Sequence, residues 1–215
     1  MRQICLNVYR FDELSAPAKA VARAWMLDCL RQDGDWYEQV YEDANDMAQL
    51  LGIEINAKPI HLRNGGSREI PSIWFTGFWS QGDGACFEGR YIYAPTIAAI
   101  RSAAPQDKTL ERIAFALELI QSQHANGLKA KMTQRGSYLH SGCMDVEVWH
   151  EDDEREVSAD AEKTLRQLMR DFADWIYAQL QKESEYRETE EYVDAQLSAM
   201  EYEFTEDGRR CAPLD

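Results

Sequence analysis

The stretch of residues 73–93, IWFTGFWSQGDGACFEGRYIY, constrains the fold of this chain more than any other, because aromatic residues crowd both sides of a short glycine-rich core. Glycine reaches positive φ without a Cβ clash, so the run Gln81-Gly82-Asp83-Gly84 predicts a sharp turn between two strands. We therefore expect an aromatic hairpin with strands over residues 70–78 and 85–93.

The composition is that of one globular domain. The chain has 215 residues, of which 45% are hydrophobic, so a single well-buried core over residues 1–215 is expected. No window approaches 18 uninterrupted apolar residues, which argues against a membrane span or a membrane partner. The N-terminal run MRQICLNVYRFDEL becomes charged too early for a signal peptide. These features predict a protein of the cytoplasm.

The cysteines indicate reduced thiols. An odd number of widely separated cysteines is unlike the disulfide framework of a secreted protein. The five are Cys5, Cys29, Cys86, Cys143 and Cys211.

The net charge of −15 is unevenly distributed along the chain. Residues 151–215 hold 20 Asp and Glu against 8 Lys and Arg, which gives −12 and leaves only −3 for the first 150 residues. Such a surface repels phosphates, whose affinity for proteins depends on Lys and Arg. Direct binding of nucleic acid is therefore not expected.

The apolar periodicity predicts an α+β fold. Helical spacing predicts helices over residues 16–33, 36–51, 95–101, 107–126 and 158–180, with an acidic helical C-terminal region over about 157–203. Alternation predicts short strands over residues 2–9, 53–55, 60–62, 128–132 and 144–148. We expect a central mixed or antiparallel sheet that contains the aromatic hairpin and packs against several helices, the last of them long.

Two helices carry more detailed predictions. In the first, Ser15 is expected to be the N-cap, and Val21, Trp25 and residues 27–30 are expected to form the buried stripe. In the second, Asp35 with Glu38 resembles a capping box, which predicts a helix start at Asp35.

Five blocks of sequence, in the same order, resemble a widespread family of phage and prophage proteins often labelled antitoxin of a toxin–antitoxin stability system. The blocks are YRFDELS at 9–15, DWYEQVYEDA at 35–44, the aromatic stretch at 73–93, RDFADWIYAQLQKESEY at 170–186 and EYEFTEDGR at 201–209. The resemblance implies a phage origin and action in the bacterial host cytoplasm. It transfers no catalytic residue.

The aromatic hairpin is a candidate binding surface. A strand points alternate side chains to opposite faces, so the near-consecutive aromatics cannot all be buried on one face. Those left exposed are expected to contact a partner protein. The aromatics concerned are Trp74, Phe75, Phe78 and Trp79. At the tip, Gln81 and Asp83 lie beside backbone N–H groups that can bind an anion, although a tight turn explains the same residues.

The acidic C-terminal region is a second candidate surface. Charge runs are usually solvated faces. In a phage protein, however, concentrated carboxylates can occupy the basic nucleic-acid groove of a host effector and speed association. The candidate residues are Glu183, Glu185, Glu188, Glu190 and Glu191.

The nearest approach to a metal site in the sequence is around His140. His140, Cys143 and Asp145 lie within six residues, but the histidines lack zinc-binding spacing, so neither a metal nor another cofactor is expected.

Two alternatives to a binding protein stay open. One is a small hydrolase or nucleotide-modifying enzyme that uses the glycine-rich loop and His140. A structural phage accessory protein is another. The sequence is also compatible with a homo-oligomer.

Overall fold

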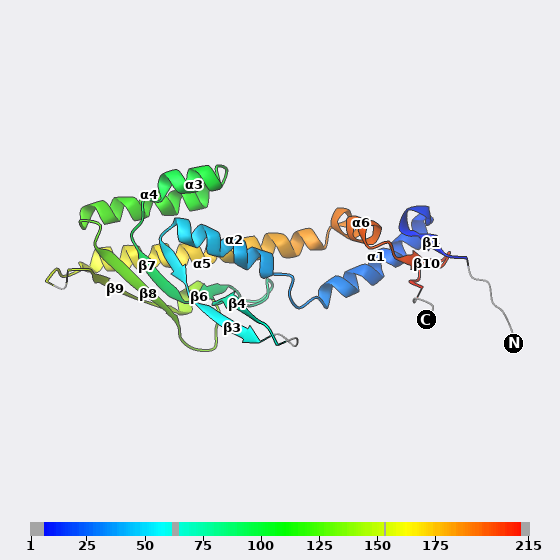
Figure 1. Ribbon diagram of the computed structural model, residues 1–215, viewed down its shortest axis with the longest axis horizontal. Coiled ribbons are helices and arrows are strands. Elements are labelled where there is room, and N and C mark those ends of the chain that lie inside the picture. Colours follow the sequence, from blue (N-terminus) through cyan, green and yellow to red (C-terminus); the bar gives the residue numbers. More distant parts are fainter. Residues whose placement is uncertain (1–6, 62–64, 153, 212–215) are drawn as a thin grey trace. The chain divides into compact units, whose positions relative to one another are not determined.

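The computed structural model describes residues 7–61, 65–152 and 154–211. The chain forms two compact units, the first made of Met1–Trp36 with Lys182–Asp215 and the second of Tyr37–Gln181. Figure 1 shows the elements in chain order. None of the helices in the described residues is long and apolar enough to cross a membrane. The prediction that residues 1–215 form one domain stays a prediction.

The second unit holds the sheets and confirms the predicted α+β fold. Its helices are α2 (Glu38–Leu50), α3 (Ile97–Ala103), α4 (Lys108–Gln123), the short 3₁₀ helix η2 (Ser141–Cys143) and most of the long α5 (Ala159–Arg187). Its strands are β2 (Ile53–Ile55), β3 (Ala57–His61), β4 (Ser67–Pro71), β5 (Ile73–Phe75), β6 (Ala85–Phe87), β7 (Gly89–Ile92), β8 (Leu128–Gln134) and β9 (Met144–His150).

Three strand pairs meet at a closed ring of backbone hydrogen bonds. The N–H of Asn56 donates to the carbonyl of Glu88 at 2.8 Å, that of Glu88 to Ser72 at 3.0 Å, and that of Ser72 to Asn56 at 2.6 Å. We call these three residues the strand junction. On either side of it the chain pairs β2 with β7, β3 with β4, and β5 with β6, all antiparallel.

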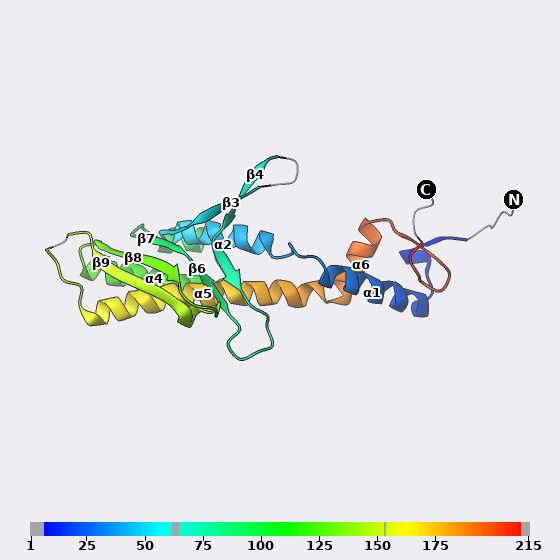
Figure 2. The same ribbon diagram turned by 90° about the horizontal axis from the view of Figure 1, so that it is seen from below.

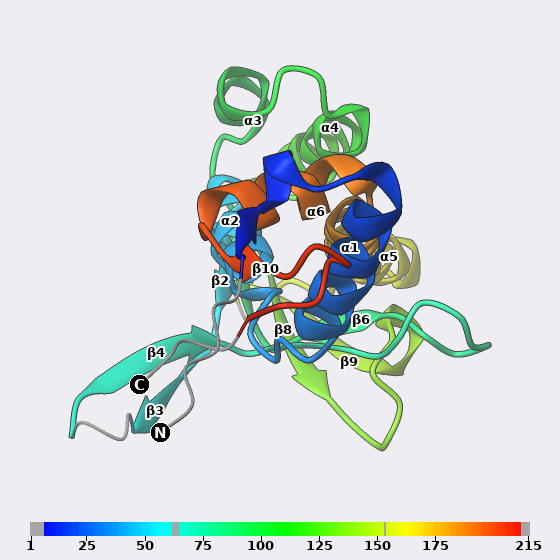
Figure 3. The same ribbon diagram turned by 90° about the vertical axis from the view of Figure 1, so that its right-hand side faces the viewer.

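The strand junction corrects the predicted hairpin. The pair β5–β6 extends only from Ile73 opposite Phe87 to Phe75 opposite Ala85, and beyond Glu88 the strand pairs with β2 instead. Gly89 makes this switch possible, because a Cβ at that position would lie 2.2 Å from the carbonyl oxygen of Glu54. In Figures 2 and 3 the β3–β4 hairpin and the loop that follows β5 extend in different directions from the sheet.

The strands β2-β7-β8-β9 form an antiparallel sheet with one covered face. On that face the Tyr91 hydroxyl accepts a hydrogen bond from the side chain of Gln121 on α4 at 3.1 Å. Beside the sheet, the Phe87 ring of β6 lies 5.6 Å from Phe172 of α5. The opposite face carries exposed charged residues in register, as expected of a sheet with one solvated side. That row is Glu54, Arg90, Lys131 and Glu147.

The predicted stripes of α4 and α5 are confirmed. On α4 the buried residues include Leu110, Ile113, Ala114, Leu117 and Ile120, and on α5 they include Leu165, Leu168, Met169, Phe172, Trp175, Ile176 and Leu180. Asp107 connects the two helices. Its Oδ1 accepts the first-turn N–H groups of Thr109 and Leu110, while its Oδ2 accepts the indole N–H of Trp175 at 2.7 Å.

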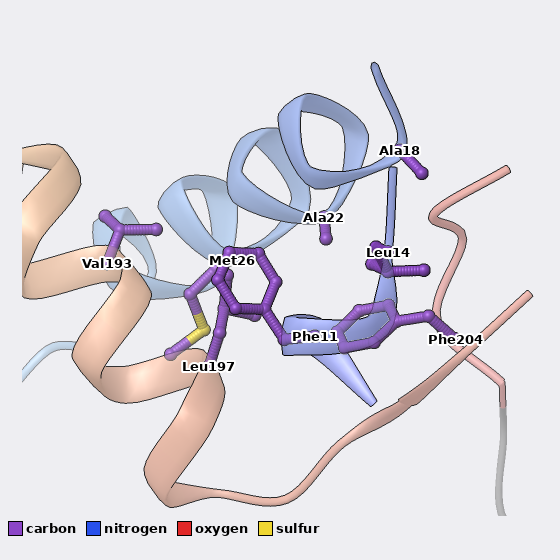
Figure 4. Close-up of a cluster of buried hydrophobic side chains, with 8 residues drawn as sticks. All are labelled: Phe11, Leu14, Ala18, Ala22, Met26, Val193, Leu197 and Phe204. Atoms are coloured by element: carbon purple, nitrogen blue, oxygen red, sulfur yellow. The ribbon is translucent and has the colours of Figure 1, made fainter. Parts of the chain in front are cut away.

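The first unit packs α1 (Ala16–Arg31) with α6 (Glu190–Ala199) and with the strand pair β1 (Tyr9–Arg10) and β10 (Glu203–Phe204); the 3₁₀ helix η1 (Phe11–Glu13) completes it. Figure 4 shows its buried side chains, Phe11, Leu14, Ala18, Ala22, Met26, Val193, Leu197 and Phe204. Ser15 is the N-cap of α1, as predicted, since its hydroxyl accepts the Ala18 N–H.

The predicted stripe of α1 is correct in part: Trp25, Leu27 and Leu30 are partly buried and pack against the core of the first unit, but Val21 does not. Val21 is 44% exposed, whereas Ala18, Ala22 and Met26 face the core. Beside Ala18 the chain approaches α1 closely, because a Cβ at Gly208 would lie 2.0 Å from the Ala18 carbonyl oxygen.

Three other boundaries differ from prediction. The strand expected over residues 2–9 lies largely outside the described residues, and the strand found begins at Tyr9. The capping box at Asp35 was wrong, since α2 begins after Tyr37 without a side-chain cap. The acidic helical region is interrupted, because Thr189 caps a new helix by accepting the Tyr192 N–H.

The strand junction predicts an unequal effect of two glycine substitutions. Gly89→Ala should lower the free energy of unfolding by roughly 3 kcal/mol, since the added methyl group meets backbone that cannot move aside. Gly77→Ala is the matched control, because its Cβ would meet nothing closer than the Asp83 carboxylate at 3.7 Å. Urea unfolding measures both. Equal stability of the two variants would contradict the packing described at the junction.

Candidate functional site

The loop of residues 76–84, which joins β5 to β6, is closed at its base. The Thr76 N–H donates to the Gly84 carbonyl at 3.0 Å, and the Gly84 N–H donates to the Thr76 hydroxyl at 3.1 Å. Gly84 also lies against His140, since a Cβ there would be 2.5 Å from the Cβ of His140. The two ends of the loop are therefore held together and against the segment before η2.

Asp83 organises the tip of the loop. Its Oδ2 accepts the backbone N–H groups of Trp79 at 2.9 Å and Ser80 at 2.6 Å, and its own N–H donates to the Ser80 carbonyl. Gly82 has a φ of 99°, as predicted for a turn glycine. The turn spans Ser80–Asp83 and lies within the loop 76–84, so it does not join the two strands directly as predicted. Asp83 is thus a positioning residue within the loop, and direct contact of Asp83 or Gln81 with a partner stays a prediction.

Two aromatic side chains fasten the loop to the core. The Phe78 ring stacks on Phe75 at 5.8 Å and lies 5.4 Å from the Tyr177 ring of α5. The Tyr177 hydroxyl donates to the Gly77 carbonyl at 3.0 Å. Burial, and then the nearby Asp83 carboxylate, raises the pKa of Tyr177, so the phenol keeps its proton and remains a donor.

Trp79 is the exception among the aromatics of the hairpin. Its side chain is 89% exposed, whereas Trp74, Phe75 and Phe78 are partly buried. The backbone that carries Trp79 is nevertheless fixed by Asp83 and by the neighbouring Phe78. The structure therefore presents one bare indole on an ordered loop.

The predicted acidic residues lie in the first unit, and some of them form ion pairs there. Glu188 lies 3.2 Å from Arg31 and Glu190 lies 3.3 Å from Arg23. Arg23 also binds Asp194 of α6 through two hydrogen bonds. These pairs connect α1 with the acidic segment, so part of the charge has a structural use. Glu185 and Glu191 are exposed and Glu183 is partly buried.

The structure brings His140 and Cys143 together but leaves Asp145 aside. The His140 Nε2 lies 3.2 Å from the Cys143 sulfur, while Asp145 pairs with Arg135. In the described part of the chain, no three His, Cys, Asp or Glu side chains are arranged to hold a metal ion. The Cys143 N–H already donates to the His140 carbonyl, so it is not available to stabilise an oxyanion.

The surroundings of this pair include residues that the sequence did not single out. The guanidinium of Arg170, on α5, donates to the Met144 carbonyl at 3.3 Å, and its Nε is buried without a partner. Burial, followed by nearby Cys143, raises the pKa of Cys86 to about 12. Cys86 is therefore an unreactive thiol. The described cysteines Cys29, Cys86, Cys143 and Cys211 are all free, and Cys5 lies outside the described residues.

Comparison with known proteins finds one family. A family model described as a domain of unknown function, DUF8835, matches residues 36–190, well over half of the chain. No curated protein and no solved structure matches the chain. The matched range contains the loop 76–84, the His140–Cys143 pair and the four-stranded sheet. On this match, the chain belongs to the DUF8835 family.

Proposed function

We propose that this chain is a phage-encoded acidic binding protein that neutralises a host defence effector or toxin by direct protein–protein contact. The observation that carries the binding role is Trp79, an indole 89% exposed on a loop held by internal hydrogen bonds. The phage origin and the class of target are supported by the sequence resemblance. The partner is a host or phage protein with a basic surface.

The rigidity of the loop favours binding. Association normally costs about 0.5–1.5 kcal/mol for each side chain that becomes ordered, so a loop ordered in advance loses less. A tryptophan buries about 150–250 Å² when it enters a partner pocket, and it is among the residues that dominate interface energies. Trp79 combines both properties.

The charge of the protein favours fast association with a basic partner. A net charge of −15 attracts a cationic surface over about 10 Å at 0.1 M salt. Glu188 and Glu190 pair with arginines, which offsets their charge. Electrostatic attraction of the partner therefore depends mainly on the other carboxylates of the acidic segment, among them Glu183 and Glu191.

The His140–Cys143 contact favours a second candidate, a thiol-dependent hydrolase. A sulfur 3.2 Å from an imidazole nitrogen is placed to pass its proton to that nitrogen, which is the first step of cysteine nucleophile chemistry. Cys143 is only partly buried, so a reagent can approach it. The binding role ranks first because the backbone N–H of Cys143 is already used.

Trp79→Ala should weaken partner binding by roughly 2 kcal/mol or more, mainly through faster dissociation. The melting temperature should not change, because the indole is 89% exposed. The measurement is binding kinetics against a partner captured from phage-infected cells. Phe115→Ala, at an aromatic 58% exposed on α4, is the control and should bind as the parent does. Unchanged binding by the Trp79 variant would reject the loop as the anchor and favour a structural accessory role.

Charge reversal in the acidic segment should slow association and reduce its dependence on salt. Glu183→Lys with Glu191→Lys changes the charge without removing the pairs of Glu188 and Glu190. The control is Glu42→Lys with Asp46→Lys, an equal change on the exposed face of α2. If stopped-flow association slows equally in both, only the net charge matters and the acidic segment is not a binding surface.

The second candidate predicts selective alkylation. Iodoacetamide should modify Cys143 faster than the exposed Cys29, because the imidazole nitrogen of His140 lies 3.2 Å from the Cys143 sulfur and is placed to act as its base. His140→Ala should bring the Cys143 rate down to that of Cys29, and Cys86 should not react in the folded protein. Mass spectrometry of timed digests gives the three rates. If Cys143 in the parent reacts no faster than Cys29, the hydrolase reading is rejected.

A further inference from the structure

A cavity of about 400 Å³ lies in the second unit among the start of α2, the β3–β4 hairpin and β5. Its walls include the aromatic residues Tyr37, Tyr41, Trp74 and Phe75, together with Lys58 and Ser72. The volume is within the range of about 300–1,000 Å³ that is typical of small-molecule sites. This cavity is separate from the exposed indole of Trp79 and from the His140–Cys143 pair.

The aromatic walls are formed in advance. The Tyr37 ring lies 4.8 Å from Tyr41 and 5.4 Å from Phe75, and Tyr41 is almost completely buried. Rings that pack on one another in this way keep their positions when the cavity is empty. They provide flat apolar surfaces, which suit a planar ring in the occupant.

Lys58 gives the cavity a positive group. Its ammonium lies 4.5 Å above the ring of Trp74, which holds the lysine stem against the cavity wall. Among the described residues no carboxylate lies within ion-pair distance of Lys58, and the carboxylate of Glu38, at the start of α2, is paired with Arg68. In a protein with a net charge of −15, an unpaired lysine beside aromatic rings favours an anionic occupant.

Ser72 lies in the wall of the cavity. The residue is 2% exposed, and its backbone N–H and carbonyl are both used in the strand junction. Its hydroxyl is buried and has no hydrogen-bond partner. A buried hydroxyl without a partner is unfavourable, so an occupant that bonds to it recovers the lost interaction.

We infer that this cavity binds a small molecule with a planar aromatic ring and an anionic group, either a carboxylate or a phosphate. The ring lies against Phe75 and the two tyrosines, the anion pairs with Lys58, and a polar atom of the molecule bonds to the Ser72 hydroxyl. The inference does not depend on the proposed partner protein.

Calorimetric titration of the full chain tests this with probes that separate the two features. Adenosine monophosphate and benzoate carry a ring and an anion, adenosine carries the ring alone, and inorganic phosphate the anion alone. At least one of the first two should bind saturably, and about ten-fold more tightly than adenosine or phosphate. Adenosine monophosphate as the tighter probe indicates a nucleotide, and benzoate as the tighter probe indicates an aromatic acid. Absence of saturable binding by both overturns the inference.

Variants locate the binding. Lys58→Met keeps the apolar stem and should weaken the better probe about ten-fold, whereas Lys131→Met, with the same charge change on the exposed face of the sheet, should not. Ser72→Ala should weaken binding without lowering the melting temperature, because it removes a hydroxyl that bonds to nothing in the empty cavity. Equal affinities of the Lys58 and Lys131 variants overturn the site. The Trp79→Ala variant should bind the probe as the parent does. Loss of partner binding in that variant therefore says nothing about the cavity, and the two proposals can fail independently.

Discussion

The ring of three backbone hydrogen bonds among Asn56, Ser72 and Glu88 is the constraint on which the sheets of the second unit depend. Each of these residues donates to one strand and accepts from another, so three continuous strands exchange partners at one point. Gly89 allows the closest approach beside it. From this junction one pair joins the main sheet, one forms the β3–β4 hairpin, and one carries the loop 76–84. The loop 76–84 and the cavity both follow from this branching.

An unbroken series of aromatic contacts connects the cavity with the loop. It runs from Tyr41 to Phe75, from Phe75 to Phe78, and from Phe78 to Tyr177 of α5. These rings bury most of the apolar surface of the hairpin, and Trp79 alone remains largely outside. An indole that stays exposed contributes almost none of its burial free energy to folding. A partner that covered the Trp79 side chain would gain that free energy on binding.

Some carboxylates of the C-terminal region form ion pairs and others do not pair with the arginines of α1. Arg23 and Arg31 of α1 pair with Asp194, Glu190 and Glu188, so part of the negative charge stabilises the first unit. Exposed ion pairs of this kind are individually worth about 0–1 kcal/mol, and the bidentate Arg23–Asp194 pair is the best defined of them. The remaining excess of negative charge is available for long-range attraction. The DUF8835 match covers residues 36–190, so the loop and the cavity belong to the part that defines the family.

Local signals in the sequence determined the elements whose partners lie close along the chain. The stripes of α4 and α5, the alternation of strands β8 and β9, the Ser15 cap and the glycine of the turn at Gly82 were predicted correctly, because each depends on residues two to four positions apart. Tertiary structure alone decided which strands pair at the junction, which face of α1 is buried, and which aromatic of the hairpin stays exposed. The contact between His140 and Cys143 and the cavity beside Lys58 belong to the same group. Each of these depends on close approach between segments far apart in sequence, and neither periodicity nor composition encodes that approach.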